Sequence, residues 1–457
     1  MLARLPGQQS GNNRTANRRA PGNAEVTHRM RLNRMSFAAR ETASSPVKPV
    51  AASRAPSHGA PSLFQIPDFR RLWTIGLVLF AVRWLEMLVV GVFVYQHTDS
   101  AFQVALMTLL RMAPMVMFGP VIGVAAERIE RRKAQIFFAA LTLANAIAMA
   151  ALAFSGTLAV WHLATASFVN GIAWAADNSV RRVMIGEVVG AERMSTAMAI
   201  DVGANNASQM LGPTIGGLVL AHLGIAGAFS ISVTCYTLAL VSAIRLRHRN
   251  ATAPVTGTGV LTRLVEGLVM AGSDRRLIGI LTVTVIYNIF GWPMTSMIPV
   301  IGQDSLHLAA SGIGILASMT GVGAFIGAIA IAVWARPRHF TRLYIGAVLS
   351  YMTLIIVFAL APVPLASGAA LLATGLANSG FSVMQATLIY LAAPVEMRSR
   401  LYGVLSLCIG SGLIGFLHIG LLAELVGAPW ATTMSGLEGL LAMALTWRWW
   451  RMLSRVE

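Results

Sequence analysis

The sequence predicts an all-α membrane protein with twelve transmembrane helices, arranged as two parallel six-helix repeats. Three observations lead to this prediction: the composition, the distribution of basic residues among the loops, and an internal repeat. Of the 457 residues, 56% are hydrophobic and only 12% are charged, whereas soluble domains usually carry about 25% charged residues. This composition excludes an ordinary water-soluble enzyme. It also excludes intrinsic disorder for the bulk of the chain, because disorder requires low hydrophobicity.

Apolar runs of roughly 20 residues begin at Leu72, and each is long enough to cross about 30 Å of hydrocarbon as a helix. The twelve predicted spans are 72–95, 101–125, 134–154, 159–181, 196–221, 226–245, 277–300, 309–334, 341–361, 365–390, 400–424 and 427–450. Residues 1–62 are rich in Asn, Ser, Pro, Ala and Arg, and we expect a disordered, basic cytoplasmic tail there. The alternative is that translation starts at Met30 or Met35.

Among the loops between spans, Lys and Arg occur only in every second one. The loops after odd-numbered spans, such as 96–100 (QHTDS) and 361–364 (APVP), contain neither Lys nor Arg. The loops after even-numbered spans are rich in arginine, as in 127–133 (ERIERRK) and 335–342 (ARPRHFTR). The positive-inside rule therefore predicts an inner-membrane protein with both termini in the cytoplasm, including the tail 451–457. These loops absorb most of the net charge of +17, so nucleic acid is not an expected partner.

Glycine positions repeat at a fixed distance along the chain. Gly119 and Gly123 in the second span recur as Gly323 and Gly327 in the eighth, 204 positions later. Six spans separate the two copies, so both have the same orientation, which is typical of transporters built from parallel repeats. The predicted units are an N-terminal bundle at 68–246, a cytoplasmic linker at 247–275 and a C-terminal bundle at 276–450.

The segment 123–133 (GVAAERIERRK) directly follows the glycine-rich second span. It resembles the signature between the second and third helices of the major facilitator superfamily, although Glu127 stands for the family's Asp and Glu130 for its Gly. Segments such as 69–73 (FRRLW) and 211–224 (LGPTIGGLVLAHLG) are similar to the transmembrane-secretion-effector, or enterobactin-exporter-like, branch. The resemblance covers about 68–450 and implies the major facilitator fold and transport of a small molecule by alternating access.

The resemblance also implies a gating role for this segment. In the family, the acidic residue faces the start of the eleventh helix, here near 400, where a carboxylate meets a positive helix end. The arginines engage an acid near the end of the fourth helix, for which this chain offers Asp177. These contacts would latch the outward-open state; the alternative is an ordinary basic loop. The gating residues implied are Gly123, Glu127, Arg128, Arg131, Arg132 and Asp177.

The fifth span contains the sequence GPTIGG at 212–217. It resembles an element of the family's antiporters, which favours export over import. Glycines spaced by four allow two helices to approach closely, and a proline bends a helix. Plain helix packing is the alternative interpretation. The expected packing positions are Gly119, Gly212, Pro213, Gly216 and Gly217.

Ionisable side chains inside the spans are few, and each is costly unless it is paired or faces water. Arg83 and Glu86 are three residues apart on the first span and share a helix face. We therefore expect either a structural ion pair or a cavity-facing site at which Glu86 takes and releases the coupling proton. Arg111 is interpreted as structural. Asp201, Asn205 and Gln209 are interpreted as a polar seam between helices.

In the family, the first, fourth, seventh and tenth helices line the central cavity. The candidates for binding substrate on these helices are Asn170, Tyr287, Asn288, Trp292, Asn378 and Gln385. For each of them, a hydrogen bond between helices is the alternative. The dipeptide Trp292-Pro293 is expected to break the seventh helix and expose main-chain carbonyls.

These observations predict a proton-coupled exporter of a small, partly apolar molecule such as a drug, a siderophore or a metabolite. We expect a monomer in contact with membrane lipid, driven by the proton gradient, with no enzymatic activity, cofactor or metal site. A facilitator or importer of a small solute is one alternative. A membrane sensor or scaffold with the same fold is another.

Overall fold

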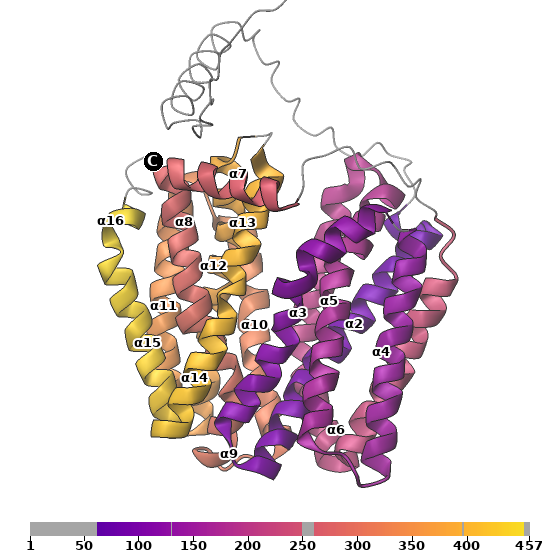
Figure 1. Ribbon diagram of the computed structural model, residues 1–457. Coiled ribbons are helices and arrows are strands. Elements are labelled where there is room, and N and C mark those ends of the chain that lie inside the picture. Colours follow the sequence, from indigo (N-terminus) through magenta and orange to yellow (C-terminus); the bar gives the residue numbers. More distant parts are fainter. Residues whose placement is uncertain (1–61, 129, 249–259, 395–396, 452–457) are drawn as a thin grey trace, which may run out of the picture. The chain divides into compact units, whose positions relative to one another are not determined.

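The apolar runs form helices because a chain in hydrocarbon must satisfy its own main-chain hydrogen bonds. The computed structural model describes residues 62–128, 130–248, 260–394 and 397–451, and no β-strand occurs among them. Figure 1 shows two groups of long helices, which we call the N-terminal half (α2–α6) and the C-terminal half (α8–α16). The tail predicted at 1–62 lies, apart from its last residue, outside the described residues.

The N-terminal half consists of five long helices and two short turns. They are η1 (Leu63–Gln65), α2 (Pro67–Thr98), α3 (Ala101–Arg128), α4 (Arg131–Phe154), α5 (Val160–Val189), η2 (Ala191–Arg193) and α6 (Met194–Ile244). Helix α6 combines the fifth and sixth predicted spans, and its direction changes at Gly224, which has a φ of 64°. This left-handed conformation is readily available to glycine, which has no Cβ.

The C-terminal half follows a linker helix and is more broken. The linker helix is α7 (Val260–Ser273). The remaining elements are α8 (Arg275–Ile286), η3 (Tyr287–Gly291), η4 (Trp292–Ser296), α9 (Ile298–Asp304), α10 (Ala310–Trp334), η5 (Pro337–His339), α11 (Phe340–Leu360), α12 (Pro364–Ala392), α13 (Arg398–Gly410), α14 (Gly412–Val426), α15 (Ala428–Leu445) and α16 (Trp447–Trp450).

The seventh predicted span is interrupted at the position expected from its sequence. A π-helical turn, η3, is followed by a 3-10 turn, η4, that begins at Trp292 and contains Pro293. A carbonyl in this break finds a partner on another helix, because the Ser435 hydroxyl of α15 donates a 2.8 Å hydrogen bond to the carbonyl of Phe290. The break therefore places irregular backbone inside the protein rather than against lipid.

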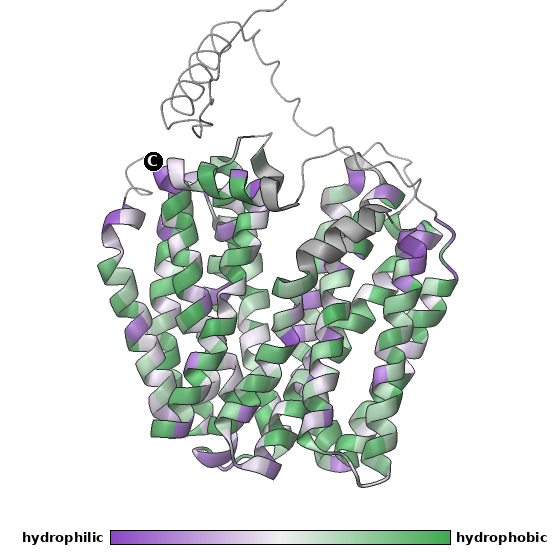
Figure 2. Cartoon of the chain, viewed as in Figure 1, coloured by the Kyte–Doolittle hydropathy of each residue, from purple (hydrophilic) through white to green (hydrophobic). Residues whose placement is uncertain are grey.

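Each predicted span coincides with a helical segment, although one boundary was wrong. The fourth span was expected to end at residue 181, yet α5 continues to Val189, so that Arg181 lies within the helix and is fully buried. Among the described residues, eight helical segments are long and apolar enough to cross a membrane, and α6 counts once among them. Twelve crossings therefore stay a prediction. Figure 2 shows the apolar character of the helices, with hydrophilic residues mainly near their ends.

Glycines bring the two halves into contact between α6 and the first half of α10. A Cβ at Gly217 would lie 2.4 Å from a carbonyl oxygen of α10, and one at Gly314 would lie 2.5 Å from a carbonyl oxygen of α6. The main-chain N–H and the hydroxyl of Thr214 both donate to the Ser318 hydroxyl, at 3.0 Å and 2.8 Å. Only glycine permits such an approach of two backbones.

The halves also meet at the helix ends whose loops lack Lys and Arg, which we call the non-basic face. The hydroxyl of Tyr95 donates to the carboxylate of Asp304, and the hydroxyl of Ser100 donates to that of Glu424. The main-chain N–H of Phe102 donates to the same Glu424 carboxylate at 3.2 Å. These bonds join α2 to α9 and the start of α3 to α14, so the halves are held together on this face.

Candidate functional site

A cavity lies between the two halves and is lined by residues from both. Its walls come from α2 and α6 on one side and from the broken seventh span, α10, α11 and α12 on the other. The lining residues are Trp84, Met87, Leu88, Gln209, Pro213, Tyr287, Trp292, Thr295, Ile298, Pro299, Ala317, Thr320, Tyr351, Thr374, Gly375 and Asn378. None of them carries a charge, and four of them are aromatic, so the central cavity is apolar with neutral polar groups.

The aromatic wall of the C-terminal half is held in place by its own contacts. The ring of Tyr287 stacks on that of Phe381 with centroids 3.8 Å apart and meets that of Tyr351 edge-on at 4.7 Å. The hydroxyl of Tyr287 donates a 2.8 Å hydrogen bond to the side-chain oxygen of Asn378. A ligand in the central cavity would therefore meet pre-positioned rings and a fixed amide.

The structure brings three of the six predicted cavity residues to this cavity, namely Tyr287, Trp292 and Asn378. The other three require correction. Asn288 is buried and donates to the carbonyl of Thr284 one turn earlier, while Gln385 donates to the hydroxyl of the same threonine at 2.9 Å. Gln385 therefore joins α12 to α8, as the alternative interpretation had it, whereas the bond of Asn288 stays within the seventh span; neither amide lines the central cavity. Asn170 belongs to the charged cluster described next.

The predicted ion pair between Arg83 and Glu86 was wrong. Glu86 is only 3% exposed and lies 3.4 Å from Arg111 of α3. It also accepts a 2.9 Å hydrogen bond from the Asn170 amide, whose oxygen in turn accepts from Asn145. Spacing along one helix places two side chains on a common face, but it does not show which neighbouring helix each of them meets. The partner that decides the environment of Glu86 is supplied by α3.

The guanidinium of Arg83 makes its direct contacts with neutral groups. It donates to the side-chain oxygen of Asn205, which also lies 3.5 Å from the indole nitrogen of Trp84. The same guanidinium lies 4.8 Å from the centre of the Trp174 ring and 5.4 Å from that of Phe80. Aromatic faces attract a cation, so the rings and the amide together hold Arg83 beside Trp84, a wall of the central cavity.

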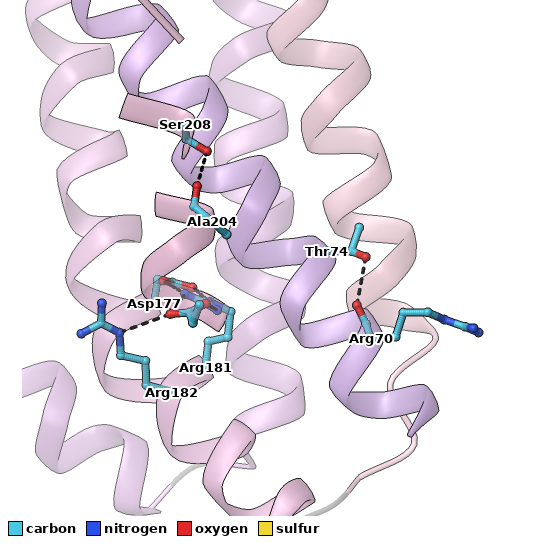
Figure 3. A network of polar contacts seen from close by, with 8 residues as sticks. Arg70, Thr74, Asp177, Arg181, Arg182, Ala204 and Ser208 are labelled. Carbon is cyan, nitrogen blue, oxygen red and sulfur yellow. Dashed lines mark hydrogen bonds and ion pairs between the residues drawn. The ribbon is translucent and has the colours of Figure 1, made fainter. Parts of the chain in front are cut away.

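A fully buried arginine connects α5 to α6 (Figure 3). Arg181 donates to both oxygens of Asp177 at 2.5 Å and 2.9 Å, and to both oxygens of Asp201 at 2.6 Å and 3.3 Å. Arg182, which is 44% exposed, lies 3.8 Å from Asp201. A Cβ at Gly76 would lie 2.3 Å from the Arg181 guanidinium, so this glycine leaves room for it. Arg181 was expected at the end of the fourth span, and this cluster was missed; the spacing of four from Asp177 was the available signal.

The gating contacts implied by the resemblance also need correction. Arg131 pairs with Glu187 rather than with Asp177, and Arg132 donates to a main-chain carbonyl of α6 at 2.9 Å. Asp177 is occupied by Arg181. Glu187 lies ten residues further along α5, or about 15 Å, which is too far for one arginine to reach both acids. The side chains of four predicted positions lie outside the described residues: Gly119, Gly123, Glu127 and Arg128.

The glycines of the 212–217 segment all lie at helix contacts. A Cβ at Gly212 would be 2.7 Å from the Trp84 side chain, and one at Gly216 would be 2.9 Å from the carbonyl oxygen of Leu85. Gly217 faces α10, and Pro213 lines the central cavity. This segment therefore packs α6 against α2 on one face and against the C-terminal half on another.

Comparison with known proteins agrees with this architecture. Residues 72–417 match the profile of the Major Facilitator Superfamily. The chain is 24% identical over 364 residues to the multidrug efflux pump Tap of Mycolicibacterium fortuitum, covering 77% of this chain and 86% of that protein. It is 21% identical over 269 residues to macrolide efflux protein A of Streptococcus pyogenes, covering 57% of this chain and 66% of that protein.

Solved structures show the same fold at low sequence identity. The nucleoside transporter NupG superposes with a TM-score of 0.65 at 11% identity, covering 82% of this chain and 97% of that one. A POT family transporter in complex with 5-aminolevulinic acid superposes with a TM-score of 0.67 at 14% identity, covering 84% and 97%. These likenesses concern the fold alone.

Proposed function

The chain belongs to the major facilitator superfamily, and from this premise we propose that it exports a small, uncharged and largely apolar molecule by proton-coupled alternating access. The family is one of transporters rather than enzymes, and its members bind small-molecule substrates. The direction, the substrate class and the coupling are the proposal. It places the protein in the inner membrane with both termini in the cytoplasm, because the basic loops lie on one face.

The central cavity is the observation that carries this proposal. Its rings, including Trp84 and Trp292, offer apolar contact area, and its neutral amides, Gln209 and Asn378, offer hydrogen bonds. An ionised substrate would enter a cavity with no counter-charge in its walls, which is unfavourable away from water. The two relatives named efflux proteins support export, at the low identities given above.

Alternating access requires that contacts on the two faces form and break in turn. The bonds from Tyr95 to Asp304 and from Ser100 to Glu424 join the halves on the non-basic face. With that face outside the cell, the structure would be the conformation that serves the cytoplasm, and export would require these bonds to break. The glycine contact between α6 and α10 would persist in both conformations.

Proton coupling is assigned in this proposal to Glu86. Its carboxylate is buried next to Arg111, and a proton on it removes the charge that attracts this arginine. Such a change inside a low-dielectric region alters the packing preference of α2, α3 and α5. The same helix α2 carries Trp84 to the wall of the central cavity, which links the carboxylate to the substrate.

Inverted membrane vesicles test the proposal directly. We expect energised vesicles to accumulate a compound from a panel of drugs and siderophores, and an uncoupler to abolish the uptake. Glu86→Gln should abolish proton-driven uptake while the protein remains folded. The control is Glu438→Gln, which neutralises a carboxylate that binds His418 and does not line the central cavity. Absence of uncoupler-sensitive uptake across the panel, or unchanged transport by Glu86→Gln at every pH, would refute the proposal.

A second pair of variants tests the cavity. Trp292→Ala should weaken apparent affinity roughly tenfold, because an aromatic contact of about 1.4 kcal/mol is lost. Trp430→Ala is the matched control, since this indole is 60% exposed on α15 and lies outside the cavity. Equal effects of the two substitutions on apparent affinity would remove the cavity from the proposal.

A further inference from the structure

The N-terminal half encloses a second, smaller cavity, which no step of the proposed transport cycle uses. It is lined by Arg83, Arg111, Asp177, Trp174 and Tyr236, together with apolar groups and two small polar ones. We propose that this small cavity binds one monovalent inorganic anion, for which chloride is the probe, between the guanidinium groups of Arg83 and Arg111.

The charges in the wall favour an anion. Arg83 and Arg111 both line the small cavity, and their like charges repel each other. The hydrogen bond of the Arg83 guanidinium goes to the neutral amide of Asn205. Two like charges facing one enclosed space destabilise each other strongly where the dielectric constant is low. An anion between them converts this repulsion into two attractions.

An unpartnered donor provides independent support. Arg111 is only 6% exposed, and its Nε is buried without a hydrogen-bond partner among the described residues. Its ion pair with Glu86 uses a different nitrogen, Nη2, at 3.4 Å. Buried polar atoms are rarely left unsatisfied, and an exception indicates an ion or a water at that place. The same side chain lines the small cavity.

The acid in the wall does not cancel this preference. Asp177 lines the small cavity, but both of its oxygens accept hydrogen bonds from Arg181. Tyr236, which is 2% exposed, lies in the wall from α6 and carries a hydroxyl donor. The charged side chains lining the small cavity are therefore two cations and one acid whose oxygens are both engaged by Arg181.

The size of the small cavity selects the ligand. Its volume is about 20 Å³, and a site of about 10–15 Å³ measured in this way holds one water. A monatomic anion such as chloride can occupy a space of this size, whereas a carboxylate attached to a larger molecule does not fit. The expected ligand is therefore a free ion, distinct from the substrate of the central cavity.

The buried charges connect this site to Glu86. Arg83, Arg111 and Arg181 are balanced by three acids, namely Glu86, Asp177 and Asp201. Protonation of Glu86, a step that rests on the proposed function, would leave one uncompensated positive charge, and the anion would balance it. Protonation and anion binding would then favour each other to the same extent, as linkage requires.

Chloride binding is measured on the purified full chain in nanodiscs, without substrate. Sodium chloride is titrated against sodium gluconate at constant ionic strength, and the thermal unfolding midpoint is recorded. We expect a saturable rise with chloride only. In Glu86→Gln, which removes the acid's charge, the affinity should increase by roughly 5- to 150-fold. Arg83→Gln should abolish the response, and Arg182→Gln, a nearby arginine that does not line the small cavity, should retain it.

Two results would overturn the assignment. One is an equal response to chloride and gluconate in both the wild type and Glu86→Gln, which would mean that water alone fills the site. The other is an unchanged chloride response in Arg83→Gln. If that variant does not fold, the affinity of Glu86→Gln decides, because a gain is required. No transport is measured, so failure of export in vesicles and failure of chloride binding are separate outcomes.

Discussion

Replacing Arg181 with glutamine should destabilise the N-terminal half more than any other single change in its buried cluster. The substitution leaves Asp177 and Asp201 buried, at 4% and 1% exposure, without the cation that donates four hydrogen bonds to them. Removal of one partner from a buried ion pair costs about 3–5 kcal/mol of unfolding free energy, because a charge is left uncompensated. We expect Arg181→Gln to fall in this range.

Two further variants rank the contributions. Asp177→Asn leaves Arg181 paired with Asp201, so the expected loss is about 1.5–3 kcal/mol, the contribution of hydrogen bonds to a charged group. Arg182→Gln removes a cation that is 44% exposed and 3.8 Å from its acid, and it should change stability little. The double variant Arg181→Gln/Asp177→Asn should lose less than the sum of its parts, because it removes one of the stranded acids.

The assay is unfolding of the purified full chain in one detergent, followed by tryptophan fluorescence. The expected order of stability loss is Arg181→Gln, then Asp177→Asn, then Arg182→Gln. A wild-type midpoint for Arg181→Gln, or equal losses for the two arginine variants, would refute the reasoning from burial. Strict additivity in the double variant would show that the charges do not interact.

Two other predictions concern packing and the non-basic face. Gly323→Ala would place a Cβ 1.9 Å from a carbonyl oxygen of α12, so we expect the free energy of unfolding to fall by about 1–3 kcal/mol. Gly346→Ala is the control: its Cβ would meet no atom within 4 Å, so it should be neutral or slightly stabilising. Equal unfolding midpoints for the two variants would contradict this prediction. The double variant Asp304→Asn/Glu424→Gln weakens the two acceptors that join the halves on the non-basic face. Spin labels at the ends of α3 and α14 on that face should then report longer distances. An unchanged distance distribution would show that these bonds do not hold the face closed.

Hydrophobicity along the chain was sufficient to predict the helices, because each apolar run has the length that hydrocarbon requires. The dipeptide Trp292-Pro293 predicted the interruption of the seventh span, since proline cannot continue the hydrogen bonding of a helix. The turn at Gly224 lay between two predicted spans, but only the structure shows that α6 continues through it. The helices and the break at Pro293 depend mainly on the sequence within a few residues, so they could be predicted without knowing the neighbouring helices.

The candidate site was less predictable, because its contacts are between helices distant in the sequence. Glu86 was recognised as important, yet its partner Arg111 lies on α3 and no spacing rule relates the two. Arg181 was expected at the end of the fourth span, because a basic run usually marks a membrane boundary. Its charge is balanced in the interior by Asp177 of α5 and Asp201 of α6. The pairing with Asp201 becomes visible only when the helices are assembled, whereas the spacing of four already indicated the pairing with Asp177.

The glycine contact between α6 and α10 has a mechanical consequence. Backbone meets backbone at Gly217 and Gly314, so no side chain stands between the two main chains at these positions. Two halves that turn about such a contact would narrow the opening at one end as they widen the opening at the other. The cavity would then be open to only one side of the membrane at a time, because the same rotation that opens one side closes the other.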